Sequence, residues 1–257
     1  MNTLSPADAK ALRGVLFDLD DTLLDHGRLT ENAYRTLFRL REAQLELVAV
    51  TGRPALWGEL LCRQWPVLGA ITENGNISFA RVDGRVRRMD PLGDAVRAER
   101  TLRLQTLAEG MSREFPELQA ADDNGARCSD FTFDIGEHRQ VDDSVVRSAM
   151  DFARARGAKT QRSSVHLHVT FDRHDKASGA LLFLRSVAKE DPTVARARYA
   201  FIGDSENDAA CFAAFKHSAA VANLRGRPSM LPRYLADRPR SAGFEQFATQ
   251  LISARNA

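Results

Sequence analysis

The hydrophobic and polar positions in the N-terminal part of the chain alternate between two patterns. Short apolar runs cover residues 14–17, 45–50 and 69–72. The segments between them, residues 30–43 and 54–65, carry apolar residues every three or four positions. The first pattern is typical of buried strands, and the second is typical of helices that bury one face. This alternation favours a parallel sheet that is covered by helices.

The pattern changes after residue 72. Residues 77–82 and 85–89 are predicted to form a hairpin, because the intervening Asp83-Gly84 favours a tight turn. We then expect a helix, a strand, a helix and a strand at residues 91–115, 128–135, 142–156 and 165–171, in that order. A hairpin followed by such elements is typical of an α+β unit, which we expect to be inserted at residues 81–171.

The strand and helix alternation returns in the last third of the chain. We expect helices at residues 176–188, 205–215 and 244–254 and strands at residues 199–203 and 219–222. The predicted fold class is therefore α/β, with a Rossmann-like parallel sheet core and an inserted α+β cap domain. The core is predicted to comprise residues 1–80 and 172–257, and the cap residues 81–171.

Composition excludes several classes of protein. The chain has 257 residues, of which 44% are hydrophobic and 27% charged, and its formal net charge of +2 does not suggest nucleic-acid binding. Cys62, Cys128 and Cys211 are too few and too widely spaced for a disulfide framework or a zinc site. Residues 1–13 lack the apolar core of a signal peptide, and no apolar run is long enough to span a bilayer. We expect a cytoplasmic protein without a membrane partner.

The first apolar run leads directly into a cluster of carboxylates. Strand alternation would place Asp18 and Asp20 on the same side, where the two charges repel unless a proton or a cation lies between them. Magnesium prefers oxygen ligands of this kind. The alternative is a helix cap, in which Asp20, Asp21 and Thr22 accept backbone N–H groups. These residues alone favour neither interpretation.

A second acidic cluster follows the predicted strand at residues 199–203. Asp204 lies at the strand's carboxyl end, where ligands bind in open parallel sheets, so the two clusters can meet. Ser205 and Asp208 have the spacing of a capping box, which would make Asp208 structural.

Two further residues offer groups that could bind an anion. Thr51 follows another predicted strand and places a hydroxyl beside backbone N–H groups, although an ordinary helix turn would look the same. Lys176 begins a predicted helix, where a cation does not stabilise the helix dipole. A positive charge held there for a ligand is one explanation.

Together these segments resemble the four ordered motifs of the haloacid dehalogenase (HAD) superfamily. The motifs are residues 17–23 (FDLDDTL), residues 50–53 (VTGR), Lys176, and residues 203–208 (GDSEND). The insertion, preceded by Glu73-Asn74-Gly75, is similar to the type IIB cap of Cof-type phosphatases, sucrose-phosphate phosphatases and mannosyl-3-phosphoglycerate phosphatases. Asp21 and Ala177 stand where the superfamily usually has glycine.

The resemblance implies roles for these residues. Asp18 would be the nucleophile that takes the phosphoryl group, and Asp20 the general acid and base. Magnesium would be held by Asp18, the backbone carbonyl of Asp20 and Asp204, with support from Asp208. Thr51 and Lys176 would hold the phosphoryl oxygens, with contributions from Gly52 and Asn207.

The function implied is a magnesium-dependent phosphatase, a phosphoric monoester hydrolase, that acts on a small phosphorylated metabolite, most plausibly a phosphosugar. A sugar phosphomutase of the phosphomannomutase kind is the alternative, and a phospho-acceptor signalling module is a third. Arg162, Ser164, His166 and His168 are the candidate substrate contacts of the cap, although a solvated strand face would have the same residues. The sequence carries no signal for an oligomeric state.

Overall fold

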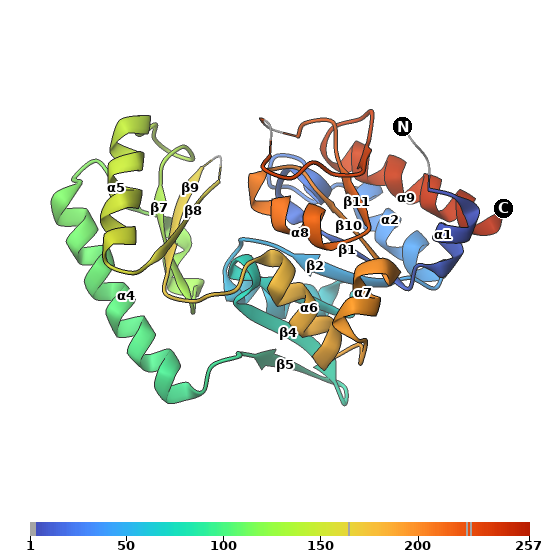
Figure 1. Ribbon diagram of the computed structural model, residues 1–257, viewed down its shortest axis with the longest axis horizontal. Helices are drawn as coiled ribbons and strands as arrows, with labels where there is room; N and C mark the ends of the chain where they lie inside the picture. The colour runs from blue at the N-terminus through green and yellow to red at the C-terminus, as the bar shows by residue number, and fades with distance from the viewer. Residues whose placement is uncertain (1–3, 164, 225, 227) are drawn as a thin grey trace.

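The larger of two sheets forms the centre of the molecule (Figure 1). The computed structural model describes residues 4–257 except 164, 225 and 227. The strand order is β12-β11-β10-β1-β2-β3-β4-β5, parallel from β12 to β3 and antiparallel from β3 to β5. The strands are β1 (Gly14–Phe17), β2 (Glu46–Val50), β3 (Gly69–Thr72), β4 (Ile77–Val82), β5 (Arg85–Met89), β10 (Tyr199–Gly203), β11 (His217–Ala220) and β12 (Tyr234–Leu235).

Helices cover both faces of this sheet, as the alternation predicts. Successive residues of β1 point to opposite faces of the sheet. Val15 and Phe17 pack in the hydrophobic cluster on one face, and Leu16 packs in the cluster on the other. The first cluster lies under α1 (Pro6–Ala11), α2 (Glu31–Glu42), α3 (Ala55–Gln64) and α9 (Arg240–Asn256). The second lies under α6 (Lys176–Ser186), α7 (Pro192–Arg198) and α8 (Ala209–Ala214). The sheet is therefore buried on both sides.

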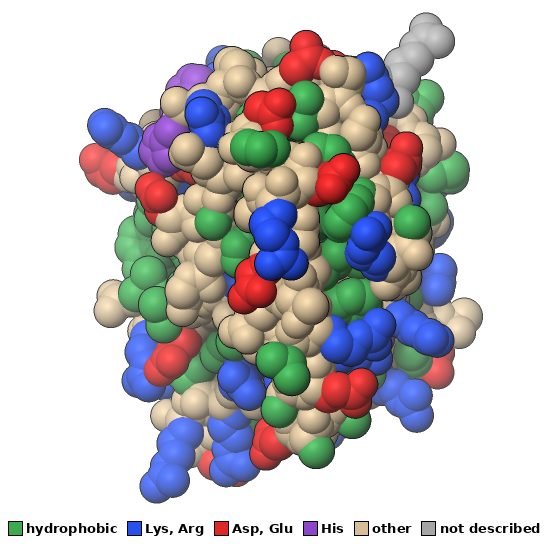
Figure 2. All heavy atoms as spheres, turned by 90° about the vertical axis from the view of Figure 1, so that its left-hand side faces the viewer, with side chains coloured by type: hydrophobic (Ala, Val, Ile, Leu, Met, Phe, Trp, Pro, Cys, Tyr) green, Lys and Arg blue, Asp and Glu red, His purple; other side chains and the backbone are tan. Residues whose placement is uncertain are grey.

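A second, antiparallel sheet lies beside the first, with strand order β6-β7-β9-β8. Its strands are β6 (Gln119–Ala120), β7 (Asp130–Asp134), β8 (Lys159–Arg162) and β9 (His166–Thr170), and its helices are α4 (Asp94–Glu114) and α5 (Asp143–Ala155). They share a separate hydrophobic cluster. We call residues 94–170 the insert module, and residues 4–89 and 176–257 the core module. The outer face of the insert module mixes apolar, acidic and basic side chains (Figure 2).

The predicted start of the insertion at residue 81 is wrong. The hairpin of β4 and β5 has the predicted bounds, but it pairs with β3 and so extends the sheet of the core module. The chain crosses to the insert module after Met89 and returns before Lys176. Hairpin residues alternate in the same way in either sheet, so their pattern could not show which sheet they join.

The structure contains short elements that were not predicted, and some predicted elements have different bounds. The sequence pattern did not reveal α1, α7, β6, β8 and β12, which are all short. The helix expected at 205–215 is divided into a 3₁₀ turn, Glu206–Asp208, and α8. The last helix begins at Arg240 rather than at residue 244, and β11 begins at His217 rather than at 219. None of the described helices is both long and apolar enough to cross a membrane.

Candidate active site

Three neighbouring parallel strands deliver the polar residues of the site. Asp18, Thr51 and Asp204 each follow the last residue of a strand, β1, β2 and β10 respectively. Because β1 lies between β2 and β10 and all three run parallel, these residues meet at one edge of the sheet. The two acidic clusters therefore lie together, as expected from the sequence.

Lys176 lies at the centre of this cluster. Its ammonium group is buried and donates hydrogen bonds to Asp18 Oδ1 at 2.7 Å, Asp208 Oδ1 at 2.8 Å and Asn207 Oδ1 at 3.3 Å. Burial alone would lower the pKa of Lys176, but the Asp18 and Asp208 carboxylates hold this pKa well above its usual range. These carboxylates compensate for the unfavourable position of a cation at the start of α6.

Asp208 is both a helix cap and a partner of the lysine. Its Oδ2 atom accepts hydrogen bonds from the backbone N–H groups of Asp204 at 2.9 Å and Ser205 at 3.2 Å, which completes the predicted capping box. Its other oxygen accepts from Lys176. Gly203 is required beside it, because a Cβ atom there would lie 2.3 Å from Asp208 Oδ2. The predicted capping box is therefore present, and the same carboxylate also contacts Lys176.

Three carboxylates form a group that could hold a metal ion. One oxygen from each of Asp18, Asp204 and Asp208 lies within 4.8 Å of the others. Burial, reinforced by neighbouring carboxylates, raises the pKa of Asp18 to about 7 and that of Asp204 to about 8. A second cation beside Lys176 would relieve this repulsion. Buried carboxylate oxygens are hard ligands, and the site therefore fits magnesium.

Asp20 approaches the site from a turn rather than from a strand. Strand β1 ends at Phe17, and residues Leu19–Leu23 form one irregular turn, so strand alternation is not what aligns the two aspartates. The Asp20 carboxylate accepts hydrogen bonds from Arg53 Nε at 2.9 Å and Nη2 at 2.5 Å. It lines the same cavity as Asp18. A cap role for Asp20 is not supported, since the partner of its side chain is a guanidinium.

Asp21 occupies a left-handed backbone conformation, with φ at 57°. Glycine adopts this conformation without strain, and aspartate tolerates it better than most residues do. The Asp21 side chain accepts a hydrogen bond from Arg240 Nε at 3.0 Å, which helps to fix the turn.

Thr51 and Gly52 form a tight turn under the cavity. Thr51 is fully buried, and its hydroxyl oxygen accepts a hydrogen bond from the backbone N–H of Arg53 at 3.1 Å. A Cβ atom on Gly52 would lie 3.0 Å from Asn74 Oδ1, so the position favours glycine. The turn leads into helix α3 as an ordinary N-terminal helix turn would, and Gly52 lines the cavity.

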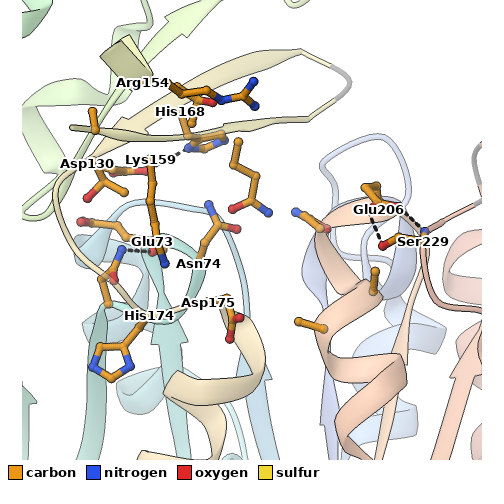
Figure 3. A pocket seen from close by; sticks show the side chains of 18 of the residues that line it. Glu73, Asn74, Asp130, Arg154, Lys159, His168, His174, Asp175, Glu206 and Ser229 are labelled. Atoms are coloured by element: carbon orange, nitrogen blue, oxygen red, sulfur yellow. Dashed lines mark hydrogen bonds and ion pairs between the residues drawn. The ribbon is translucent and has the colours of Figure 1, made fainter. Parts of the chain in front are cut away.

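A cavity of about 770 Å³ lies over the site, between the two modules. Its core side carries Asp18, Asp20 and Asp204. The insert module contributes Asp122, Asp123, Arg127, Glu137, Arg162, Ser163, Val165, His166 and His168. Three of the four candidate cap contacts line this cavity, and Ser164 lies outside the described residues. A second cavity, of about 580 Å³, is the one that Figure 3 shows. It shares His168, Glu206 and Asn207 with the first.

The histidines of the insert module are held by carboxylates. His166 Nε2 lies 2.8 Å from Glu137, and His168 Nδ1 lies 2.9 Å from Asp130. Burial lowers the pKa of His168, although Asp130 opposes this shift. These contacts fix the positions of the His166 and His168 rings in the wall of the cavity.

The sequence interpretation missed two arginines of this cavity. Arg53 lies over the ring of Trp57, 4.0 Å from its centroid, and binds Asp20. Arg127 pairs with Asp123 and Asp130 and is almost completely buried. Arg53 belongs to the motif at residues 50–53 but was given no role of its own, whereas no local pattern marks Arg127.

The comparisons with known proteins agree with the motifs. Residues 15–92 match the family model of haloacid dehalogenase-like hydrolases. No curated protein matches the chain. The predicted resemblance to the HAD superfamily is therefore confirmed by the family model, over the part of the chain that holds the first two motifs.

Solved structures share the whole fold at low sequence identity. The Thermoplasma acidophilum protein 0175 is 19% identical, with a TM-score of 0.75 over 93% of this chain and 98% of that chain. BT1666 from Bacteroides thetaiotaomicron, described among HAD phosphatases, is 17% identical, with a TM-score of 0.67 over 99% and 100%. The sucrose-phosphatase of Synechocystis, solved with sucrose and phosphate, is 16% identical, with a TM-score of 0.64 over 93% and 98%. The predicted fold class is confirmed.

Replacing Lys176 tests how far the site depends on its buried cation. Lys176→Met should lower the free energy of unfolding by about 3–5 kcal/mol, because it leaves two buried carboxylates without their counterion. Chemical denaturation at pH 8 measures the loss. Lys216→Met removes an exposed lysine that pairs with Asp8, and this control should have far less effect. Equal losses in the two variants would contradict a central role for Lys176.

Proposed function

We propose that this protein is a magnesium-dependent phosphatase that hydrolyses the phosphate monoester of a small metabolite, in particular a phosphosugar. The observation that carries the proposal is the meeting of Asp18, Lys176, Asp204 and Asp208 at the carboxyl ends of parallel strands, beneath a cavity of about 770 Å³. A cavity of this size is typical of small-molecule sites. We propose that the insert module acts as a cap over the core module.

Asp18 is the proposed nucleophile. A carboxylate can attack phosphorus and form an aspartyl-phosphate, while the alcohol leaves with the electron pair of the broken P–O bond. Lys176, 2.7 Å from Asp18 Oδ1, lies where it can bind an oxygen of the transferring group and offset its charge. Thr51, Gly52 and Asn207 are proposed to complete the phosphoryl pocket.

Asp20 is the proposed general acid and base. It would give its proton to the leaving oxygen and then take a proton from the water that hydrolyses the aspartyl-phosphate. Its carboxylate is held by Arg53 in this structure, so Asp20 must exchange this partner for the reacting oxygen. Arg53 can then turn towards the substrate, because both side chains line the cavity.

Magnesium would be held by Asp18, Asp204 and the backbone carbonyl of Asp20. Asp208 is proposed to act mainly by positioning, since both of its oxygens already accept hydrogen bonds. When bound, the ion supplies positive charge that stabilises the transferring phosphoryl group.

The polar lining of the cavity supports a sugar as the leaving group. Carboxylates and histidines of the insert module, including Glu137 and His166, offer both acceptors and donors for hydroxyl groups. The Synechocystis relative, which was solved with sucrose and phosphate, is consistent with this class of substrate. A screen of phosphate release over phosphorylated sugars, nucleotides and cofactors tests the proposal. Transfer to a sugar without free phosphate would favour the mutase instead.

Asp18→Asn should abolish turnover and leave the fold intact. The amide keeps the shape of the side chain but lacks the nucleophilic oxygen anion. Phosphate release by the purified variant measures the effect, and its circular dichroism spectrum tests folding. Asp151→Asn, on the exposed face of α5, is the matched control and should keep wild-type activity. Near wild-type turnover by a folded Asp18→Asn variant would exclude Asp18 as the nucleophile.

Asp204→Asn should separate metal binding from stability. Without metal at pH 8, the variant should be at least as stable as the wild type, because a carboxyl group with a raised pKa destabilises the folded state above its unfolded pKa. Magnesium at about a hundred times its dissociation constant should stabilise the wild type by about 2.7 kcal/mol. This stabilisation should be lost in the variant, as followed by thermal unfolding with and without magnesium. Equal stabilisation of both proteins would exclude a metal site at Asp204.

Asp20→Asn should slow turnover by about a hundredfold to ten-thousandfold for a sugar phosphate. An aryl phosphate has a better leaving group and needs less protonation, so its first step should be partly spared. Rapid-quench measurement of bound and free phosphate distinguishes the two steps. Equal losses for the two substrates, without accumulated phosphoenzyme, would contradict the proposed role.

A further inference from the structure

Glu73 is a buried carboxylate that the proposed mechanism does not use. It follows β3 in a 3₁₀ turn, Glu73–Gly75, with φ at 49°, and its exposed fraction is 0%. Figure 3 shows Glu73 below the sheet of the insert module, on the side where that sheet carries Asp130 and His168. A glutamate so completely buried needs partners that compensate for its lost hydration.

Four hydrogen bonds provide this compensation, and they come from both modules. Oε1 accepts from the backbone N–H of Ala55 at 2.9 Å and from that of Cys128 at 2.8 Å. Oε2 accepts from the backbone N–H of Ser129 at 2.6 Å and from its hydroxyl at 2.5 Å. Ala55 begins α3 in the core module, whereas Cys128 and Ser129 precede β7 in the insert module. One carboxylate therefore joins the two modules.

Arg127 adds a second connection from the same segment. Its side chain is 2% exposed, and Nη1 donates to the backbone carbonyl of Gly52 at 3.1 Å. Glu73 and Arg127 thus fix residues 127–129 to both ends of the turn that runs from Thr51 to Ala55. This turn carries the proposed phosphoryl-binding groups, so the position of the insert module is coupled directly to the catalytic turn.

These contacts lie beside the second of the two segments where the chain crosses between the modules, because the turn that holds Glu73 packs against Asp175. Arg97 joins the crossings by pairing with Asp90 at 2.8 Å and with Asp172 at 2.7 Å. Thr170 links the second crossing to Ser129, since its hydroxyl donates to the carbonyl of Ser129 and accepts from the N–H of Asp172. Glu73 thus provides a non-covalent third connection, in addition to the two covalent ones.

We propose that Glu73 is a positioning residue, which docks residues 127–129 on the turn at residues 51–55 and so sets the closed geometry of the cavity. The catalytic consequence of this inference rests on the proposed phosphatase function. The docking of residues 127–129 on the turn does not depend on that function. Burial, together with Asp130, raises the pKa of Glu73 to about 7, so a charged group here carries a cost that its hydrogen-bond donors reduce only in part. Hydrogen bonds to a charged acceptor are stronger than neutral ones, which suits a contact between modules.

Glu73→Gln tests the docking without reference to activity. The amide can still accept one pair of hydrogen bonds, but its NH₂ group cannot accept from the Ser129 N–H. Hydrogen exchange at the Cys128 and Ser129 amides should accelerate by about ten- to a hundredfold, the factor that corresponds to one lost hydrogen bond to a charged group. Glu190→Gln is the matched control, because Glu190 is also buried but pairs with Arg13 far from the cavity. Unchanged exchange in Glu73→Gln, or equal acceleration in the control, would overturn the proposal.

Kinetics test the catalytic consequence. Glu73→Gln should lower kcat/KM for the best phosphosugar by about tenfold or more and change it far less for a small aryl phosphate, which needs few contacts with the insert module. Equal losses for both substrates would assign Glu73 a merely structural role. Ser129→Ala removes only the hydroxyl that donates to Glu73 from the insert module. We expect it to lower kcat/KM for the phosphosugar in the same way but less strongly. This variant keeps the proposal testable if Glu73→Gln does not fold. If no phosphate ester is hydrolysed, the proposed function fails, while the exchange result still decides the docking.

Discussion

The candidate site depends on the buried ammonium group of Lys176. It lies between Asp18, at the end of β1, and Asp208, beyond β10, and it is supplied by a helix from the other side of the insertion. Without this cation, the carboxylates at the ends of adjacent parallel strands would repel one another. The lysine thus permits a concentration of negative charge that a folded protein would otherwise avoid, and that same concentration makes the site suitable for a metal ion.

The fold class could be predicted because it follows from local patterns, whereas the candidate site residues were assigned through the resemblance of four motifs to the HAD superfamily. Buried strands are continuous apolar runs, and Asp18, Thr51 and Asp204 each follow such a run, so the sequence indicated that they could lie at one edge of a sheet. The strand order that makes them neighbours came from the structure. The boundary at residue 81 could not be placed correctly, because a hairpin has the same alternation in either sheet. Glu73 and Arg127 were missed for another reason. Their partners are distant in sequence, and neither position shows which distant segment will supply them.

Asp208 shows that one carboxylate can cap a helical turn and also bind a side chain of the candidate site. The capping box and the lysine contact use different oxygens of one carboxylate. Because two backbone N–H groups fix one oxygen, the other is held in place for Lys176 at little additional cost in side-chain entropy. The cap therefore orients the charge, and a residue with an ordinary role in helix formation helps to place the lysine of the site.

The separate hydrophobic clusters of the two modules have a consequence for how such proteins can diverge. Among the described residues, the buried cluster of the insert module shares no member with the clusters under the larger sheet. Substitutions that repack the insert module can therefore accumulate without disturbing the packing that aligns the strand ends. New ligand preferences could thus arise by mutation in one module while the chemistry of the other is inherited unchanged, provided that the few polar contacts between the modules survive.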